Sequence, residues 1–216
     1  MRPRKLDCME GEDRQAWRVI QGYVSAHMHS RLAALEGAIE VEDAQLVLQT
    51  ARDFVSFSEL ARRLHEVINV GDSEQPYMGA THTMRSILEG LADCYTIKIK
   101  RQRRLPKVFG HASQQLRLVQ EILDIMTPLQ LEARFRQRDQ RLVMSLSPIQ
   151  AENELLHTLS RQSALRYAVT HTSEASVRAL ILSRELATEQ IGLYITKDSL
   201  HLSFQIASQL VLPFGD

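Results

Sequence analysis

Two histidines separated by a single residue, His27 and His29, are the first side chains in this sequence that could do chemistry. A neutral imidazole can act as a nucleophile, carry a proton or bind a metal ion. Apolar residues recur around them every three or four positions, among them Val24, Met28 and Leu32, and this spacing predicts a helix. Residues of a helix are about 100° apart, so the two rings flank the apolar stripe on opposite sides of Met28. They are therefore not placed to bind one metal ion together, and the alternative to a chemical role is that both are ordinary solvated side chains.

The other histidines give weaker signals. His65 lies near the end of a second predicted helix, where an imidazole commonly interacts with the helix dipole. No Ser-His-Asp or Cys-His arrangement, phosphate-binding loop or metalloprotease motif is present in the sequence. Four further histidines are scattered and fit no metal-ligand template: His111, His157, His171 and His201.

Length and composition narrow the class of protein. The chain has 216 residues, of which 44% are hydrophobic and 24% charged, which suits one globular domain or two small ones. Twenty-six basic and 26 acidic residues give a net charge of zero, which argues against a general binder of polyanions. Cys8 and Cys94 form no CxxC pair and suit free thiols in a reducing cytosol. No apolar run approaches the roughly 18 residues that span a membrane, so we expect a cytoplasmic protein.

The elements that must position the histidines begin with a helical hairpin. Apolar residues at helical spacing predict one helix over residues 13–39 and a second over 47–68, with a short polar connection at 40–43. Two such helices form an antiparallel pair. Because one hairpin cannot cover its own apolar stripes, we expect a homodimer in which two hairpins form a four-helix bundle.

A linker at residues 70–80, rich in Gly, Pro and Ser, separates the hairpin from a segment of mixed periodicity. We therefore predict an α+β protein with a helical hairpin over 12–70 and an α/β sandwich over 80–216, with its helices on one face of a sheet. Helices are expected at 83–93, 111–126, 148–162 and 174–190, and strands at 95–100, 131–136, 142–146, 192–196, 200–205 and 209–213.

This order of elements resembles the histidine kinases of two-component signalling, most closely the HWE-type branch. Those proteins have a dimerising hairpin that carries a phosphoacceptor histidine, followed by an α/β domain that binds ATP. The similarity covers about residues 15–216 and is one of pattern and order. It rests on four segments, which are AHMHSRLAAL at 26–35, SELARRLHEV at 58–67, LRLVQEILDIM at 116–126 and QLVLPF at 209–214.

The departures from that family concern the nucleotide site. Glu121 matches a glutamate of the nucleotide-binding helix, but Ile125 stands where the family has an asparagine that holds magnesium and phosphate. Isoleucine has no oxygen to offer Mg²⁺. Nucleotide lids also use glycines, because the backbone must approach the phosphates, and none of the nine glycines lies between His111 and Ile191. We therefore expect no ordinary ATP binding.

A kinase-like frame without its nucleotide site resembles the dimeric histidine phosphotransferases of phosphorelays. That resemblance implies that a histidine takes a phosphoryl group from the aspartate of one response-regulator receiver domain and passes it to another. His29 is the first choice for the phosphoacceptor and His27 the second. Ser30, Arg31 and Ala34 would contact the receiver. The protein itself would need no cofactor, since the receiver brings its own Mg²⁺.

Two alternatives remain. The first is a pseudokinase or adaptor that binds a receiver or a kinase through the same hairpin and does no chemistry. The second is a DNA-binding regulator that uses either the basic run 98–107 or the segment 185–200, which has some features of a helix-turn-helix. We do not expect nucleic acid to be the main partner, because no aromatic residues are interleaved with the six cations of the basic run: Lys98, Lys100, Arg101, Arg103, Arg104 and Lys107.

Overall fold

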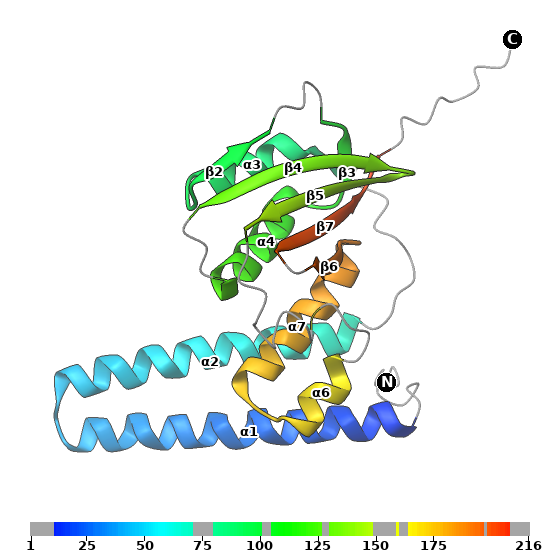
Figure 1. Ribbon diagram of the computed structural model, residues 1–216. Coiled ribbons are helices and arrows are strands. Elements are labelled where there is room, and N and C mark those ends of the chain that lie inside the picture. Colours follow the sequence, from blue (N-terminus) through cyan, green and yellow to red (C-terminus); the bar gives the residue numbers. More distant parts are fainter. Residues whose placement is uncertain are drawn as a thin grey trace, which may run out of the picture. The chain divides into compact units, whose positions relative to one another are not determined.

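The apolar spacing near the N-terminus does produce two long helices that form an antiparallel hairpin, α1 (Gly11–Glu40) and α2 (Ala44–Val70), as the computed structural model shows (Figure 1). The turn between them includes Glu42 with φ of 58°. Asp43 then starts α2, because its Oδ1 accepts the backbone N–H groups of Gln45 at 2.9 Å and Leu46 at 3.1 Å. The predicted hairpin with its short polar connection is confirmed.

The structure describes residues 11–70, 80–100, 105–126, 130–148, 159, 164–196 and 198–207. They fall into two compact units. The first contains the hairpin and residues 164–181, and the second contains the remainder. Helix α7 (Glu174–Thr188) contributes residues 174–181 to the first unit and 182–188 to the second. Residues 164–181, which fall within the predicted 80–216 segment, thus have their contacts with the hairpin.

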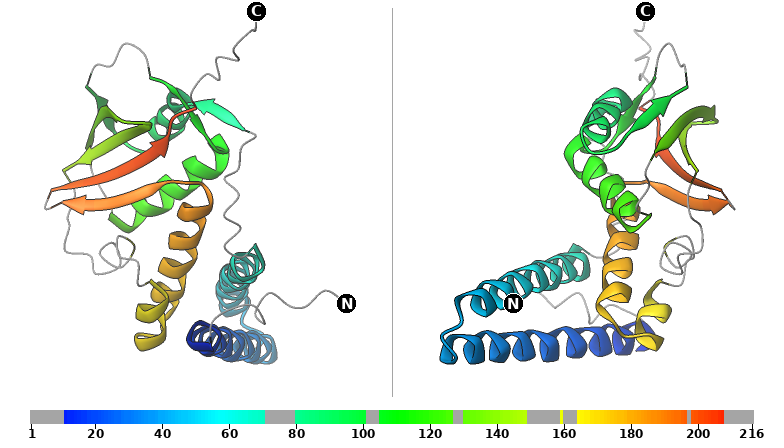
Figure 2. Two further views of the ribbon diagram at one scale, coloured as in Figure 1. Left: turned by 90° about the vertical axis from the view of Figure 1, so that its right-hand side faces the viewer. Right: turned by 60° about the vertical axis from the view of Figure 1, so that its left-hand side comes forward.

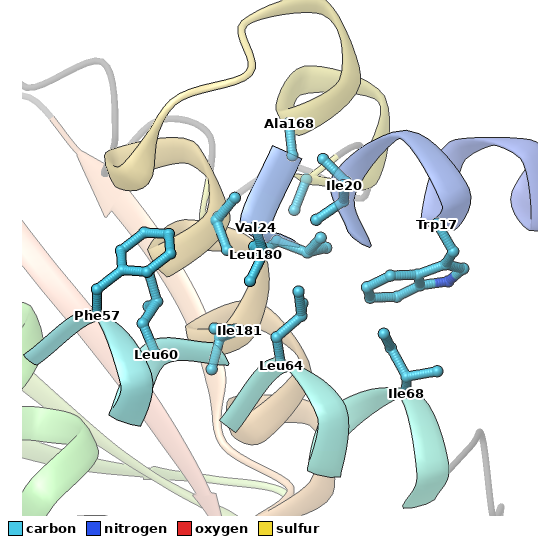
Figure 3. Close-up of a cluster of buried hydrophobic side chains, with 12 residues drawn as sticks. Trp17, Ile20, Val24, Phe57, Leu60, Leu64, Ile68, Ala168, Leu180 and Ile181 are labelled. Atoms are coloured by element: carbon cyan, nitrogen blue, oxygen red, sulfur yellow. The ribbon is translucent and has the colours of Figure 1, made fainter. Parts of the chain in front are cut away.

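The core of the first unit is built from four helices (Figure 3). Helices α1 and α2 supply the larger side chains, and α6 (Ala164–Thr170) and the start of α7 close the cluster from one side. Helix α6 was not anticipated, because its seven residues are too few for a clear period. The buried cluster contains Trp17, Ile20, Val24, Phe57, Leu60, Leu64, Ile68, Ala164, Ala168, Val177, Leu180 and Ile181.

The second unit contains a five-stranded sheet of order β2-β4-β5-β7-β6 and a separate two-stranded ribbon, β1-β3. Strand β2 runs parallel to β4, and the other pairs in the sheet are antiparallel. Helices α3 and α4 lie on one face of the sheet in both views of Figure 2. The bounds of these elements are β1 Thr81–Thr83, α3 Met84–Ala92, β2 Ile97–Ile99, β3 Lys107–Phe109, α4 Ala112–Met126, β4 Leu131–Arg138, β5 Arg141–Ser147, β6 Gly192–Thr196 and β7 Ser199–Gln205.

Alternation along the strands decides which face of the sheet is covered. The inward face of β4, β5 and β7 includes eight apolar side chains that are no more than 1% exposed, whereas most of their neighbours in sequence are polar and lie on the other face. The predicted α/β layout is therefore confirmed, including its helices on one face. These eight are Leu131, Ala133, Leu142, Met144, Leu146, Leu200, Leu202 and Phe204, and Phe135 on the same side of β4 is partly buried.

Two short strands were missed, because β1 and β3 have three residues each and cannot show an alternating pattern. The predicted strand at 209–213 and most of the predicted helix at 148–162 lie outside the described residues, as does nearly all of the linker at 70–80. Within the described part of the chain, no helix is long and apolar enough to cross a membrane.

Gly110 provides a stability test of the second unit. It follows β3 with φ of 116°, and a Cβ there would lie 2.1 Å from Gln115 Nε2 and 2.7 Å from Glu189 Oε2. The Gln115 side chain is fully buried and donates to the carbonyl of Phe109 at 2.8 Å, so it cannot easily move aside. We expect Gly110→Ala to lower the free energy of unfolding by about 1–3 kcal/mol in urea titrations. Gly37→Ala is the control, because a Cβ there meets nothing within 4 Å, and it should raise stability slightly.

Candidate functional site

His29 lies on the exposed surface of α1 with one ring nitrogen held by the helix. Its Nδ1 is 2.7 Å from the backbone carbonyl oxygen of Ser25, one turn earlier. A carbonyl only accepts hydrogen bonds, so Nδ1 carries the proton. In the neutral ring, Nε2 then has a free lone pair. The helix backbone therefore selects the tautomer of His29 whose nucleophilic atom is the outer nitrogen.

Most side chains around His29 are small, and Leu32, which is 42% exposed, is the large one within a turn. Ala26, Ser30 and Ala33, which are within one helical turn of His29, are all exposed. Further along the helix, a Cβ added at Gly22 or at Gly37 would meet nothing within 4 Å. At Gly22, Ala26, Ser30, Ala33 and Gly37 there is therefore no long side chain between His29 and an approaching partner.

His27 has a different environment, although its side chain is also exposed. Its ring centroid is 4.2 Å from that of Tyr23 and 6.0 Å from that of Phe57, which belongs to α2. His27 thus faces toward α2. His29 is two residues further along the helix, which turns it by about 200° to the other side.

Arg31 lies on the same side as His27. Its guanidinium stands 4.0 Å from the centroid of the Phe57 ring, and its Nη2 donates to Glu174 Oε2 at 2.8 Å. Arg178 also approaches Glu174, at 3.5 Å. Burial raises the pKa of Tyr23, and the charge of Glu174 raises it further. Tyr23, His27, Arg31, Phe57 and Glu174 thus form one cluster, which we call the aromatic–arginine cluster.

The predicted site residues are therefore divided between two sides of α1. His29 lies away from α2, and His27 and Arg31 lie toward it. Ser30 and Ala34 are exposed on α1 beside them. The sequence pattern placed both histidines at the margin of one stripe, but the buried face is centred on residues nearer to His27, such as Ile20 and Val24.

The positions that correspond to the kinase nucleotide site lie on α4. Glu121 is partly buried there, and the backbone of Ile125 belongs to the same helix, while its side chain lies outside the described residues. The inward side of α4 is packed with apolar side chains that are no more than 1% exposed. They are Leu118, Val119, Ile122 and Leu123. Among the described residues, no group of three His, Cys, Asp or Glu side chains is arranged to hold a metal ion.

One polar site was missed in the sequence. Ser145 of β5 and His201 of β7 are paired across the outer face of the sheet, with Ser145 Oγ 2.8 Å from His201 Nδ1. Burial lowers the pKa of His201. The two residues are 56 positions apart, and only the strand pairing brings them together, so no spacing could have shown it.

The structure gives different outcomes for the two segments that were considered for DNA binding. The helix-turn-helix interpretation of residues 185–200 is wrong, because α7 ends at Thr188 and an antiparallel pair of strands, β6 and β7, follows. Alternation in Leu193–Ile195 favours a strand over a second helix. In the basic run, residues 101–104 lie outside the described residues. Lys98 and Lys100 lie at the edge of the sheet, and Lys100 Nζ is 3.0 Å from Glu132.

Comparison with known proteins supports the fold. A scan against models of protein families found no match, and neither did a search of curated proteins. Among solved structures, the Acinetobacter baumannii histidine kinase AdeS aligns with a TM-score of 0.50 and 8% sequence identity, over 86% of this chain and 95% of that one.

Two further structures align over most of both chains at lower scores. A bacterial phosphotransferase has a TM-score of 0.35 and 11% identity over 91% of this chain and 98% of its own. A histidine kinase from Burkholderia phymatum STM815 has a TM-score of 0.36 and 14% identity over 92% and 98%. The alignment with AdeS shows that this chain, a helical hairpin followed by a mixed α/β domain, has a fold similar to that of a histidine kinase.

Proposed function

We propose that this protein is a histidine phosphotransferase of a two-component phosphorelay in the cytoplasm. His29 accepts a phosphoryl group from the aspartate of one receiver domain and passes it to another, without ATP. The observation that carries the proposal is the geometry of His29, an exposed imidazole on a helical hairpin whose Nδ1–H is held by the Ser25 carbonyl. This leaves Nε2 directed outward as the nucleophile.

The chemistry requires little more than positioning. Nε2 of His29 attacks the phosphorus of the receiver's aspartyl phosphate, the bond from phosphorus to the aspartate oxygen breaks, and the carboxylate leaves. The ring then carries positive charge, which the hydrogen bond from Nδ1 to the Ser25 oxygen stabilises. The Mg²⁺ that neutralises the phosphoryl oxygens comes with the receiver, so the hairpin needs no metal ligand of its own.

The shape of the hairpin surface suits a globular partner. Because Ala26, Ser30 and Ala33 are small and exposed, a receiver can bring its aspartate close to the His29 ring. We propose that Ser30, Arg31 and Ala34 belong to the contact surface, which then extends from His29 around α1 to the side that faces α2. Arg31 can take part while it holds Glu174, since a guanidinium has five N–H donors.

Independence from ATP is supported by the sequence of the second unit. Ile125 replaces the metal-holding asparagine that the histidine kinase resemblance implies, and no glycine lies between His111 and Ile191. The inward side of α4 is occupied by tightly buried apolar side chains. Calorimetric titration of the full chain with ATP and Mg²⁺ tests this part of the proposal. No heat of binding is expected, and micromolar affinity would contradict it and favour an active kinase.

The main experiment mixes the purified full chain with receiver domains that carry a radioactive aspartyl phosphate. We expect label to move to this protein, in a form stable to base and labile to acid, as a phosphohistidine is. A second, unlabelled receiver should then remove it. An adaptor that only binds receivers would form the complex and acquire no label, and this outcome would contradict a phosphotransferase.

We also propose that two copies associate through their hairpins. Both helices expose apolar side chains on the half of the hairpin nearest the turn, including Leu32 and Ile39 on α1 and Leu48 and Val55 on α2. Val55 is 65% exposed and Leu48 is 53% exposed. They are seven residues apart and therefore on one side of α2. A second copy would remove this surface from water.

The dimer can be tested with charge substitutions on that side of α2. We expect the double variant Leu48→Glu/Val55→Glu to be monomeric, because association would bury four carboxylates without partners. Light scattering combined with size-exclusion chromatography measures the mass. Gln49→Glu adds a carboxylate at an exposed position of the same helix about 100° away from Leu48, and it should remain dimeric. A monomeric wild-type chain at micromolar concentration would contradict the dimer.

A further inference from the structure

The outer face of the sheet carries a serine and a histidine in the arrangement of an activated nucleophile. Ser145 on β5 is the register partner of His201 on β7, and Ser145 Oγ lies 2.8 Å from His201 Nδ1. Met144 and Leu146, the neighbours of Ser145 on β5, are fully buried on the opposite face, so the strand holds the hydroxyl firmly on the outer side.

The contacts of Ser145, Thr196 and the Ser199 carbonyl around His201 are all satisfied as hydrogen bonds in one arrangement of protons, and we assign that arrangement. Thr196 Oγ1 donates its single proton to the carbonyl of Ser199 at 3.3 Å. At 3.1 Å from His201 Nε2, the same oxygen can then only accept, so Nε2 carries the ring proton. In the neutral ring Nδ1 is left with a lone pair, and Ser145 Oγ donates to it. The hydrogen bonds therefore form a series from Ser145 through His201 and Thr196 to the Ser199 carbonyl.

The ring of His201 is held in this position from a second side. It stacks on Tyr194 of β6 with centroids 4.3 Å apart and ring planes 10° apart. Burial lowers the pKa of His201, so the ring is neutral at pH 7 and Nδ1 is available as a base. A base next to a hydroxyl, with a third group orienting the base, is the general arrangement of nucleophilic serines.

A substrate can reach Ser145 because the sheet surface is hollowed there. The hollow is open to solvent and lined by Ser145, His201, Ser147, Ser199, Pro148, Arg134, Glu132 and Asp198. Arg134 is the register partner of Ser145 on β4, and its Nε is bound to Glu132. Arg134 lines the hollow, and its guanidinium has further N–H donors with which it could stabilise a negative oxygen formed there.

We propose that Ser145 and His201 form a nucleophilic site that hydrolyses small carboxylic esters. Ser145 Oγ attacks the ester carbonyl carbon, and its proton passes to His201 Nδ1. The negative oxygen of the tetrahedral intermediate is stabilised by the Arg134 guanidinium. When the intermediate collapses, the bond to the alcohol oxygen breaks and the alcohol leaves with the proton from Nδ1. Water then attacks the acyl-Ser145 by the same route, which releases the acid and restores the hydroxyl. This activity is independent of His29 and of phosphoryl transfer.

The first test is covalent labelling of the full chain with an alkyl fluorophosphonate, in which the serine oxygen displaces fluoride. We expect one label per chain, located on Ser145 by peptide mass spectrometry. Ser145→Ala should take up none. Ser147→Ala should label at the wild-type rate, because Ser147 lines the same hollow on the same strand and is not paired with His201. Absence of label on Ser145 in the folded wild-type chain would overturn the proposal.

The second test separates activation from mere exposure of the hydroxyl. His201→Gln should slow labelling, and the hydrolysis of 4-nitrophenyl acetate, by about 100-fold, the usual contribution of a general base. Thr196→Val leaves the imidazole in place and removes the acceptor of the Nε2–H bond together with the hydrogen bond to the Ser199 carbonyl. It should slow both reactions by a smaller factor, and it serves as the readout if His201→Gln does not fold. Equal rates in wild type and in the folded histidine or threonine variants would overturn the proposal.

Discussion

Replacement of His29 by alanine is expected to abolish phosphoryl transfer from a phosphorylated receiver to this protein. The substitution removes the Nε2 lone pair, which is the only new bonding partner of the phosphorus in the proposed step, and no neighbour can replace it. The small exposed residues within a turn of it, Ala26, Ser30 and Ala33, offer no imidazole. Radioactive phosphate on the chain, separated by electrophoresis, should fall below detection. Stability should hardly change, because the side chain is exposed.

His27→Ala is the matched control, since it removes an imidazole from the same helix two residues away. His27 packs beside Tyr23 and Phe57, so its loss should leave transfer within a few-fold of the wild-type rate. If His27→Ala abolishes transfer and His29→Ala does not, the second-choice histidine is the acceptor. If the wild-type chain and both variants bind the phosphorylated receiver equally well and none acquires label, the protein is an adaptor. Calorimetric titration with the receiver provides the binding measurement.

The local elements of this fold were predictable where the pattern is long or a turn is distinctive. Helices α1 and α2 follow from apolar spacing over more than twenty residues each. The hairpin of β4 and β5 follows from two alternating runs around a polar turn. The structure pairs Arg138 with Arg141 across that turn and gives Asp139 a φ of 53°, a conformation that aspartate adopts more readily than most residues.

Contacts between distant segments were not predictable in the same way. Residues 164–181 follow the β4–β5 hairpin in the chain, yet Ala168, Val177 and Leu180 complete the core of the N-terminal hairpin. Their apolar character requires burial but does not specify against what. The pairing of Ser145 and His201 was not predictable for the same reason. In the sequence each is one polar residue of an alternating strand, and only the register between β5 and β7 brings them together.

Within the candidate site, too, contacts with distant segments could not be predicted from the local pattern. The apolar stripe of α1 placed His27 and His29 symmetrically about Met28. The structure breaks that symmetry, because Phe57 from α2 and Glu174 from α7 lie on the side of His27 and Arg31. The helices that pack against α1 decide which margin of its apolar stripe is covered, and the stripe alone does not predict where those helices lie.

Phe57 carries the largest expected effect on stability. Its side chain is 1% exposed in the core of the first unit (Figure 3). Its ring also lies under the Arg31 guanidinium and beside His27. Phe57→Ala removes most of a buried aromatic ring and leaves a cavity that the helices cannot fill, so we expect the free energy of unfolding to fall by about 3–5 kcal/mol. A loss of this size is a large fraction of the stability of an ordinary domain.

Urea titration followed by circular dichroism measures the change, with two controls on the same helix. Phe57→Leu keeps the position apolar and most of its volume, and it should cost about 1–2 kcal/mol. Ser56→Ala alters an exposed neighbour and should change stability by less than about 0.5 kcal/mol. The two variants of Phe57 also separate packing from the aromatic–arginine cluster, because both remove the ring under Arg31 and only alanine opens the large cavity. Equal, small losses in both would mean that Phe57 is not enclosed by α6 and α7 in solution, and that the first unit consists of the hairpin alone.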